Sequence, residues 1–292
     1  MRKLRPIVML LSAAALVLLV PRGVRAGGVF VTGHDPDFHA VQGGNPSGAQ
    51  HIIQDSLNYV TNNQVNSILL VTDRVNPGAG YSDPELGLTA SGYTFDVADN
   101  GAAGGAVLDL STVNFSSYSA VVVASDFGGW LRQSELDILN SRKTDLLNYV
   151  NGGGGLVAFA ESGPPSGLAS TGLFGFLPFL ATSATLNQTE VGNQVTPFGA
   201  TLGLTDADVD GNASHNIFTS TGGLNVVDRD SNGEILSLAT RETISVTGVS
   251  AVPEPPMFQM GGLLLMSGLG LLRRRRIRFG SDAQAQSGTH TS

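Results

Sequence analysis

Short uncharged apolar runs, separated by segments with helical spacing, constrain the fold of this chain most. The runs are VFVT at 29–32, SILLVT at 67–72, YSAVVVAS at 118–125 and GLVAFA at 155–160. Near-continuous apolar strands are typical of parallel sheets that are covered on both faces, and strands that alternate with helices build such sheets. The pattern predicts an α/β fold with a mostly parallel sheet and helices on both faces.

The segments between these runs predict helices and one further strand. Apolar residues recur at helical spacing over 50–60, and 93–97 has the character of a strand. A capping box at 134–137 is expected to begin a helix that continues to Val150, with Gly152 as its C-cap.

The composition changes after Pro164 and Pro165. Gly, Thr, Ser and Asn dominate, and 226–238 is typical of a β-hairpin with its turn at Ser231-Asn232-Gly233. We therefore expect an α/β core over 27–163 and an extension over 164–250 that is rich in strands and loops.

The N-terminal residues have the pattern of a secretory signal peptide. Arg2, Lys3 and Arg5 precede an apolar run over 7–20, and Val24-Arg25-Ala26 fits a small-x-small cleavage site. Residues 1–26 are therefore expected to be removed during export.

The C-terminal residues have three consecutive parts. Val252-Pro253-Glu254-Pro255 comes first, an uncharged apolar run over 257–272 follows, and Arg273, Arg274, Arg275 and Arg276 come next. A helix over 257–272 rises about 24 Å and spans a hydrocarbon core of about 30 Å only marginally. The positive-inside rule keeps the arginines in the cytoplasm and the body outside.

This order of Val-Pro-Glu-Pro, short apolar helix and arginine cluster resembles the PEP-CTERM sorting signal of Gram-negative bacteria, here over 251–276. The resemblance implies recognition by an exosortase, cleavage near Pro253-Glu254-Pro255, and a place at the cell surface or in an exopolysaccharide or biofilm matrix. The polar tail over 277–292 is longer than usual for such proteins. The alternative is an ordinary single-pass membrane anchor without processing.

The charge and the lack of cysteine exclude several classes of function. Between the two terminal segments the body carries six basic and 22 acidic residues, a formal charge of −16, against −8 for the whole chain. Such a body repels nucleic acid and attracts divalent cations. The absence of cysteine excludes disulfides, thiol nucleophiles and thiolate metal sites.

The loop after the first apolar run holds the first candidate site. His34, Asp35, Asp37 and His39 offer two imidazoles and two carboxylates, which predicts a transition-metal site. The LmbE-like sugar deacetylases carry a similar His-Pro-Asp-Asp loop, although the order differs here and their later His-x-x-His pair is missing. The alternative is a structural turn, because Asp-Pro begins turns.

A second candidate site lies in the extension. Asp206, Asp208 and Asp210 alternate before Gly211 as in the first half of an EF-hand calcium loop, but Ile217 stands where the bidentate glutamate should be. The spacing predicts a weak Ca²⁺ site, and the similar stretch over 228–233 is better explained by the hairpin turn.

A second resemblance covers about 28–163. Asp126-Phe127-Gly128-Gly129, the helix after it, and the glycines before the next strand resemble the class I glutamine amidotransferase-like fold and its ThuA-like relatives. This implies a flavodoxin-like sheet. Where those enzymes carry their cysteine, this chain has Ala160 and Glu161, so glutaminase chemistry is excluded.

Two functions follow from the sequence. The first is an exported, surface-sorted protein whose α/β domain binds a partner without catalysis. The second is a metal-dependent extracellular hydrolase, such as a saccharide deacetylase or esterase, that uses His34, Asp37 and His39.

Overall fold

The structure is a computed structural model, and it describes residues 26–74, 83–100, 107–126, 131–161, 172–177, 181–186, 191–212, 214–245 and 248–249. The chain divides into two units at Ser250, and every described residue belongs to the first. The predicted signal peptide, apart from Ala26, and the predicted sorting signal therefore lie outside the described residues.

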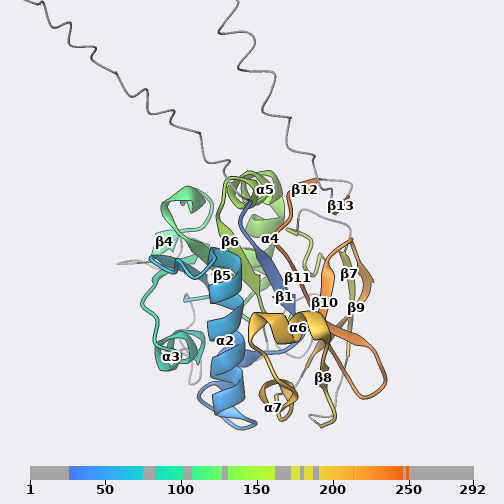
Figure 1. Cartoon of the computed structure of the whole chain (residues 1–292). Coiled ribbons are helices and arrows are strands. Elements are labelled where there is room, and N and C mark those ends of the chain that lie inside the picture. Colours follow the sequence, from blue (N-terminus) through green and yellow to red (C-terminus); the bar gives the residue numbers. More distant parts are fainter. Residues whose placement is uncertain are drawn as a thin grey trace, which may run out of the picture. The chain divides into compact units, whose positions relative to one another are not determined.

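One large sheet organises the described residues (Figure 1). Its strands run in the order β4-β3-β2-β5-β6-β1-β11-β10-β8, and β9 pairs with both β11 and β7. The strands are β1 (Val29–Thr32), β2 (Ile68–Val71), β3 (Asp96–Asp99), β4 (Leu108–Asp109), β5 (Ala120–Val123), β6 (Gly155–Ala158), β7 (Ala181–Thr185), β8 (Gln194–Val195), β9 (Asn216–Thr221), β10 (Asn225–Arg229) and β11 (Ile235–Thr240). A separate pair is formed by β12 (Ile244–Ser245) and β13 (Gly248–Val249).

The sheet is mixed, which corrects the expectation of a mostly parallel one. From β4 to β1 all neighbours are parallel. Beyond β1 the pairing is antiparallel, because β11 lies along β1 with Val29 opposite Thr240 and Thr32 opposite Ser237. The extension thus completes the sheet of the core instead of forming a separate layer.

Helices cover both faces of the parallel part. The α-helices are α1 (Pro36–His39), α2 (Pro46–Thr61), α3 (Asp83–Ala90), α4 (Gln133–Ser141), α5 (Lys143–Asn151), α6 (Pro197–Leu202) and α7 (Asp206–Val209), and η1 (Phe115–Ser117) is a 3₁₀ helix. Alternate strand residues face opposite sides, so Val29 and Val31 join a core under α4 and α5, whereas Phe30 joins one under α2 (Figure 1).

Several predicted elements are confirmed with shifted boundaries. The apolar runs become β1, β2, β5 and β6, and the hairpin becomes β10 and β11. The strand expected at 93–97 lies at Asp96–Asp99. The single helix expected after the capping box is two helices joined at Arg142, and Ser134 lies inside α4, whose N-cap is Arg132. Gly152 is the C-cap of α5, as predicted.

None of the helices in the described residues is both long and apolar enough to cross a bilayer. The helix expected over 257–272 lies outside them and stays a prediction.

The glycines before β6 make room for an aromatic ring. A Cβ at Gly154 would overlap the ring of Tyr149, whose hydroxyl donates to the carbonyls of Tyr118 and Gly155 at 3.2 and 3.1 Å. We expect Gly154→Ala to lower the free energy of unfolding by about 1–3 kcal/mol because the ring must move. At Gly152 the nearest atoms to a Cβ are carbonyl oxygens at 3.1 and 3.4 Å, so Gly152→Ala is the matched control. Equal losses in urea unfolding would contradict this explanation.

Candidate functional site

The loop that follows β1 is clamped by distant segments of the chain. The amide of Gly33 donates to the Leu236 carbonyl at 2.7 Å, and the amide of His215 donates to the Gly33 carbonyl at 2.6 Å. A Cβ on residue 33 would overlap the backbone of Asn216, so only glycine fits. The loop then enters α1, with Pro36 in its first turn.

His34 forms a buried ion pair with Asp228. Its Nε2 lies 2.8 Å from Asp228 Oδ2, its Nδ1 lies 3.0 Å from the Asn212 carbonyl oxygen, and both side chains are buried. A carbonyl and a carboxylate only accept hydrogen bonds, so both ring nitrogens donate and the ring is an imidazolium. Burial alone would lower the pKa of His34, but the charge and hydrogen bond of Asp228 and the bond to Asn212 raise it overall.

Asp35 lies between two imidazoles. Its Oδ1 is 3.3 Å from His39 Nε2, and its Oδ2 is 3.3 Å from His215 Nε2. Asp35 is fully buried, whereas 7% of the His39 side chain and 13% of the His215 side chain are exposed. The two rings therefore separate this carboxylate from solvent. His39 Nδ1 lies 3.2 Å from the Gln42 carbonyl oxygen, which fixes the ring.

This row of His39, Asp35 and His215 does not have the geometry of a metal centre. A zinc ion needs its protein ligands around one point, but the two imidazoles approach different oxygens of the carboxylate. Across the ranges that the structure describes, no three His, Asp or Glu side chains are grouped to hold a metal ion.

The sequence matches no family model and no curated protein.

Asp37 points away from the other members of its loop. Its Oδ2 accepts the Ser125 amide at 2.9 Å and its Oδ1 accepts the Phe38 amide at 3.2 Å, which joins α1 to the end of β5. Burial raises the pKa of Asp37 to about 7, although the hydrogen bonds from Ser125 oppose the shift.

The structure thus brings together two of the four predicted metal ligands. Asp35 and His39 are neighbours, whereas His34 faces Asp228 and Asp37 faces the Ser125 amide. Both nitrogens of His34 act as donors and leave no lone pair for a metal. Metal binding by the four residues stays a prediction, and the geometry gives it no support.

Glu161 follows β6 at the position where the amidotransferase resemblance would place a cysteine. Its amide donates to Asn216 Oδ1 at 2.7 Å, and its carboxyl accepts the Phe174 amide. Burial raises the pKa of Glu161 well above its usual range, the Phe174 hydrogen bond lowers it, and the charge of Asp126 adds to the rise. A buried carboxyl group, not a thiol nucleophile, therefore occupies this position.

The predicted calcium ligands lie in and next to a helical turn. Asp206 Oδ1 accepts the Val195 amide at 2.7 Å, and Asp210 Oδ1 accepts the Gly192 and Asn193 amides at 2.9 and 2.7 Å. Asp208 Oδ2 accepts the Thr205 amide at 2.8 Å in a capping box that begins α7. The three carboxylates face different segments, so the geometry does not support this predicted Ca²⁺ site either.

Asp208 also pairs with His51, with 2.7 Å between its Oδ1 and the ring Nδ1. Burial raises the pKa of Asp208, but the hydrogen bonds from His51 and Thr205 lower it overall.

The stretch over 228–233 is the hairpin turn, as predicted. Asp230 Oδ1 accepts the Asn232 and Glu234 amides at 2.9 and 2.7 Å, and Gly233 has a φ of 86°. Asp228 itself pairs with His34. Neither this role nor that of His215 beside Asp35 has a local sequence signal, because each partner comes from a distant part of the chain.

Proposed function

We propose that this chain is an exported, surface-sorted protein whose α/β body binds a partner without catalysis. The order of Val-Pro-Glu-Pro, the apolar run over 257–272 and four arginines carries the sorting part, together with the signal peptide pattern over 1–26. By its resemblance to PEP-CTERM signals, the tail is a substrate for an exosortase, and exopolysaccharide is the partner that the resemblance suggests.

The pairing of ionisable groups at the candidate site supports a binding role over the metal-dependent hydrolase. A hydrolase that uses His34, Asp37 and His39 as ligands needs all three around one ion. Their hydrogen-bonding atoms instead face Asp228, the Ser125 amide and Asp35. The paired groups hold α1 and the ends of β1 and β5 together, which suits a rigid scaffold.

We also propose a flavodoxin-like core, supported by the strand order β3-β2-β5-β6; β1 departs from the flavodoxin order, because it lies beside β6 and not at the reversal. The chain runs outward from β2 to β3 and β4, then returns to β5 on the other side of β2. Such a reversal creates a switch point at the carboxyl ends of β2 and β5. Asp73 follows β2 and forms an ion pair with Arg132 at 2.7 Å. Ser125 follows β5 and donates its amide to Asp37.

The sorting proposal is tested by expressing the full chain in a host with an exosortase and in one without. We expect a product truncated near Pro253-Glu254-Pro255 only in the first host, and loss of most of it when these three residues are replaced by alanine. Immunoblotting of envelope fractions and mass spectrometry of the new C-terminus measure the outcome. Pro256→Ala is the matched control and should be cleaved normally. An uncleaved chain in both hosts would indicate a simple anchor and overturn the proposal.

A further inference from the structure

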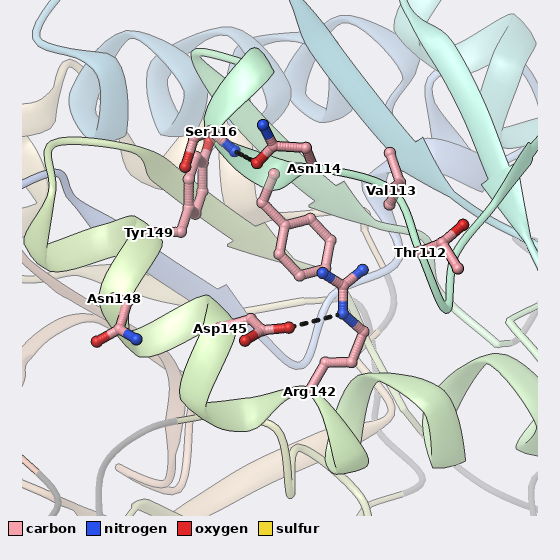
Figure 2. A pocket seen from close by; sticks show the side chains of 9 residues that line it. Thr112, Val113, Asn114, Ser116, Arg142, Asp145, Asn148 and Tyr149 are labelled. Atoms are coloured by element: carbon pink, nitrogen blue, oxygen red, sulfur yellow. Dashed lines mark hydrogen bonds and ion pairs between the residues drawn. The ribbon is translucent and has the colours of Figure 1, made fainter.

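A groove lies at the edge of the sheet opposite the cluster formed by His34, Asp35, His39 and His215. The residues of η1 precede β5 and the turn after α5 precedes β6, so the groove is at the amino ends of these strands, whereas the cluster follows β1. Two adjoining hollows of about 400 and 240 Å³ form it, and they share Ser116, Asn148 and Tyr149; Figure 2 shows the larger hollow. Their combined size falls in the range of ligand pockets, about 300–1,000 Å³.

The walls of the groove are held in place before any ligand arrives. The guanidinium of Arg142 lies 4.0 Å above the centre of the Phe115 ring, and its Nε is 3.0 Å from Asp145 Oδ2 (Figure 2). Its Nη1 donates to the Leu110 carbonyl at 2.7 Å. Asn114 Oδ1 accepts the Ser116 amide at 3.1 Å. Side chains fixed in this way lose little conformational entropy when a ligand binds.

Hydrogen-bonding groups on these walls remain available to a ligand. Within the described part of the chain, the side chains of Asn148 and Ser116 make no hydrogen bond of their own, and Asn114 uses only its oxygen. Arg142 uses two of its five N–H groups, and Asp145 uses one oxygen. The groove therefore offers donors and acceptors side by side.

The charge and polarity of the groove restrict the class of ligand. Among the residues that the structure describes, Arg142 is the only basic one that lines the two hollows, and Asp145 neutralises it. A phosphate or polyanion needs an excess of positive charge, which the acidic body does not supply. An apolar ligand needs apolar walls, but Phe115 and Tyr149 are only 3% and 5% exposed.

We propose that this groove binds a neutral saccharide, with one sugar unit in each hollow. Sugar hydroxyls both donate and accept hydrogen bonds, so they match the amides, the hydroxyl and the Arg142–Asp145 pair. A peptide binds through an open strand edge or through apolar anchor pockets, and helices and buried rings line this groove instead. The proposal rests on the binding role proposed above but is independent of sorting.

Calorimetric titration of the full chain, purified in a detergent without sugar, tests this site. The probes are neutral hexasaccharides of glucose, mannose and N-acetylglucosamine, an acidic hexagalacturonate, and a neutral Gly-Ser hexapeptide. We expect a neutral hexasaccharide to bind and Ser116→Trp, which fills the junction of the hollows, to abolish binding. Asn148→Ala should weaken binding about five- to tenfold, the effect of one lost hydrogen bond.

Thr144→Ala is the matched control, because Thr144 is exposed on α5 but does not line the groove. Its affinity should equal that of the wild type, and unfolding curves of all variants confirm that they are folded. Absence of binding by every neutral hexasaccharide, tighter binding of the acidic sugar or the peptide, or unchanged affinity in Ser116→Trp would each overturn the saccharide site. None of these outcomes affects cleavage in the sorting experiment.

Discussion

Asp228→Ala is expected to lower the free energy of unfolding by about 3–5 kcal/mol. The substitution leaves the fully buried imidazolium of His34 without its counter-charge, and breaking one side of a buried ion pair has a cost of this order. Urea unfolding at pH 6 measures the loss. Asp137→Ala is the matched control, because this exposed carboxylate pairs only with Gln133 in its own helix, and its effect should stay within about 0.5 kcal/mol.

A double-mutant cycle separates the ion pair from general loss of packing. His34→Gln combined with Asp228→Asn should cost clearly less than the sum of the two single variants, since each single variant leaves an unpaired polar group. Additive losses, or a cost below about 1 kcal/mol for Asp228→Ala, would show that His34 is not held as a buried cation.

The stability of Asp37→Asn relative to the wild type is expected to rise by up to about 4 kcal/mol between pH 4 and pH 8. Burial raises the pKa of Asp37 from 3.8 to about 7. An acid whose pKa is higher in the folded state favours folding while protonated, so this carboxyl progressively destabilises the native state between pH 4 and pH 7. Asparagine removes the ionisation but can accept only one of the two amides that Asp37 binds, and the lost hydrogen bond costs about 1 kcal/mol at every pH. Urea unfolding from pH 4 to pH 8 measures the difference.

Three other ionisable groups also contribute to the pH dependence of the free energy of unfolding. The raised pKa of Glu161 acts in the same direction as Asp37 above its unfolded value of 4.5, and the stabilisation from His34 is present below pH 6.5 and lost above its folded pKa. Asp208 has a lowered pKa, so its contribution is lost only as the pH falls below 3.8. A reduced slope between pH 4 and pH 7 should therefore remain in Asp37→Asn. An unchanged slope would contradict the burial of an ionisable Asp37.

The parallel part of the fold was predictable because its strands are buried on both faces, which makes their apolar runs continuous. The boundary of β3 was not predictable in this way. Tyr93 and Phe95 are only partly buried, and they precede a strand that carries Asp96 and Asp99. The local spacing of apolar residues does not indicate that β11 pairs with β1, so the sequence did not predict the mixed sheet. The helix start predicted from the capping box was wrong, because α4 begins one residue before Ser134.

The same limit applies to the candidate site. The spacing of Asp35 and His39 is a local pattern, and the structure confirms that the two are neighbours. The partners that decide the chemistry, Asp228 and His215, are brought in by β10 and by the segment before β9. Composition marks such residues as polar and does not indicate that Asp228 contacts His34 or that His215 contacts Asp35.

The position of β1 between β6 and β11 has a consequence for the order of folding. β1 cannot pair on both of its edges until residues 237–240 are present, because these residues of β11 form its second neighbouring strand. Contacts between such distant residues form slowly. A chain built in this way cannot complete its large sheet until β11 has been synthesised.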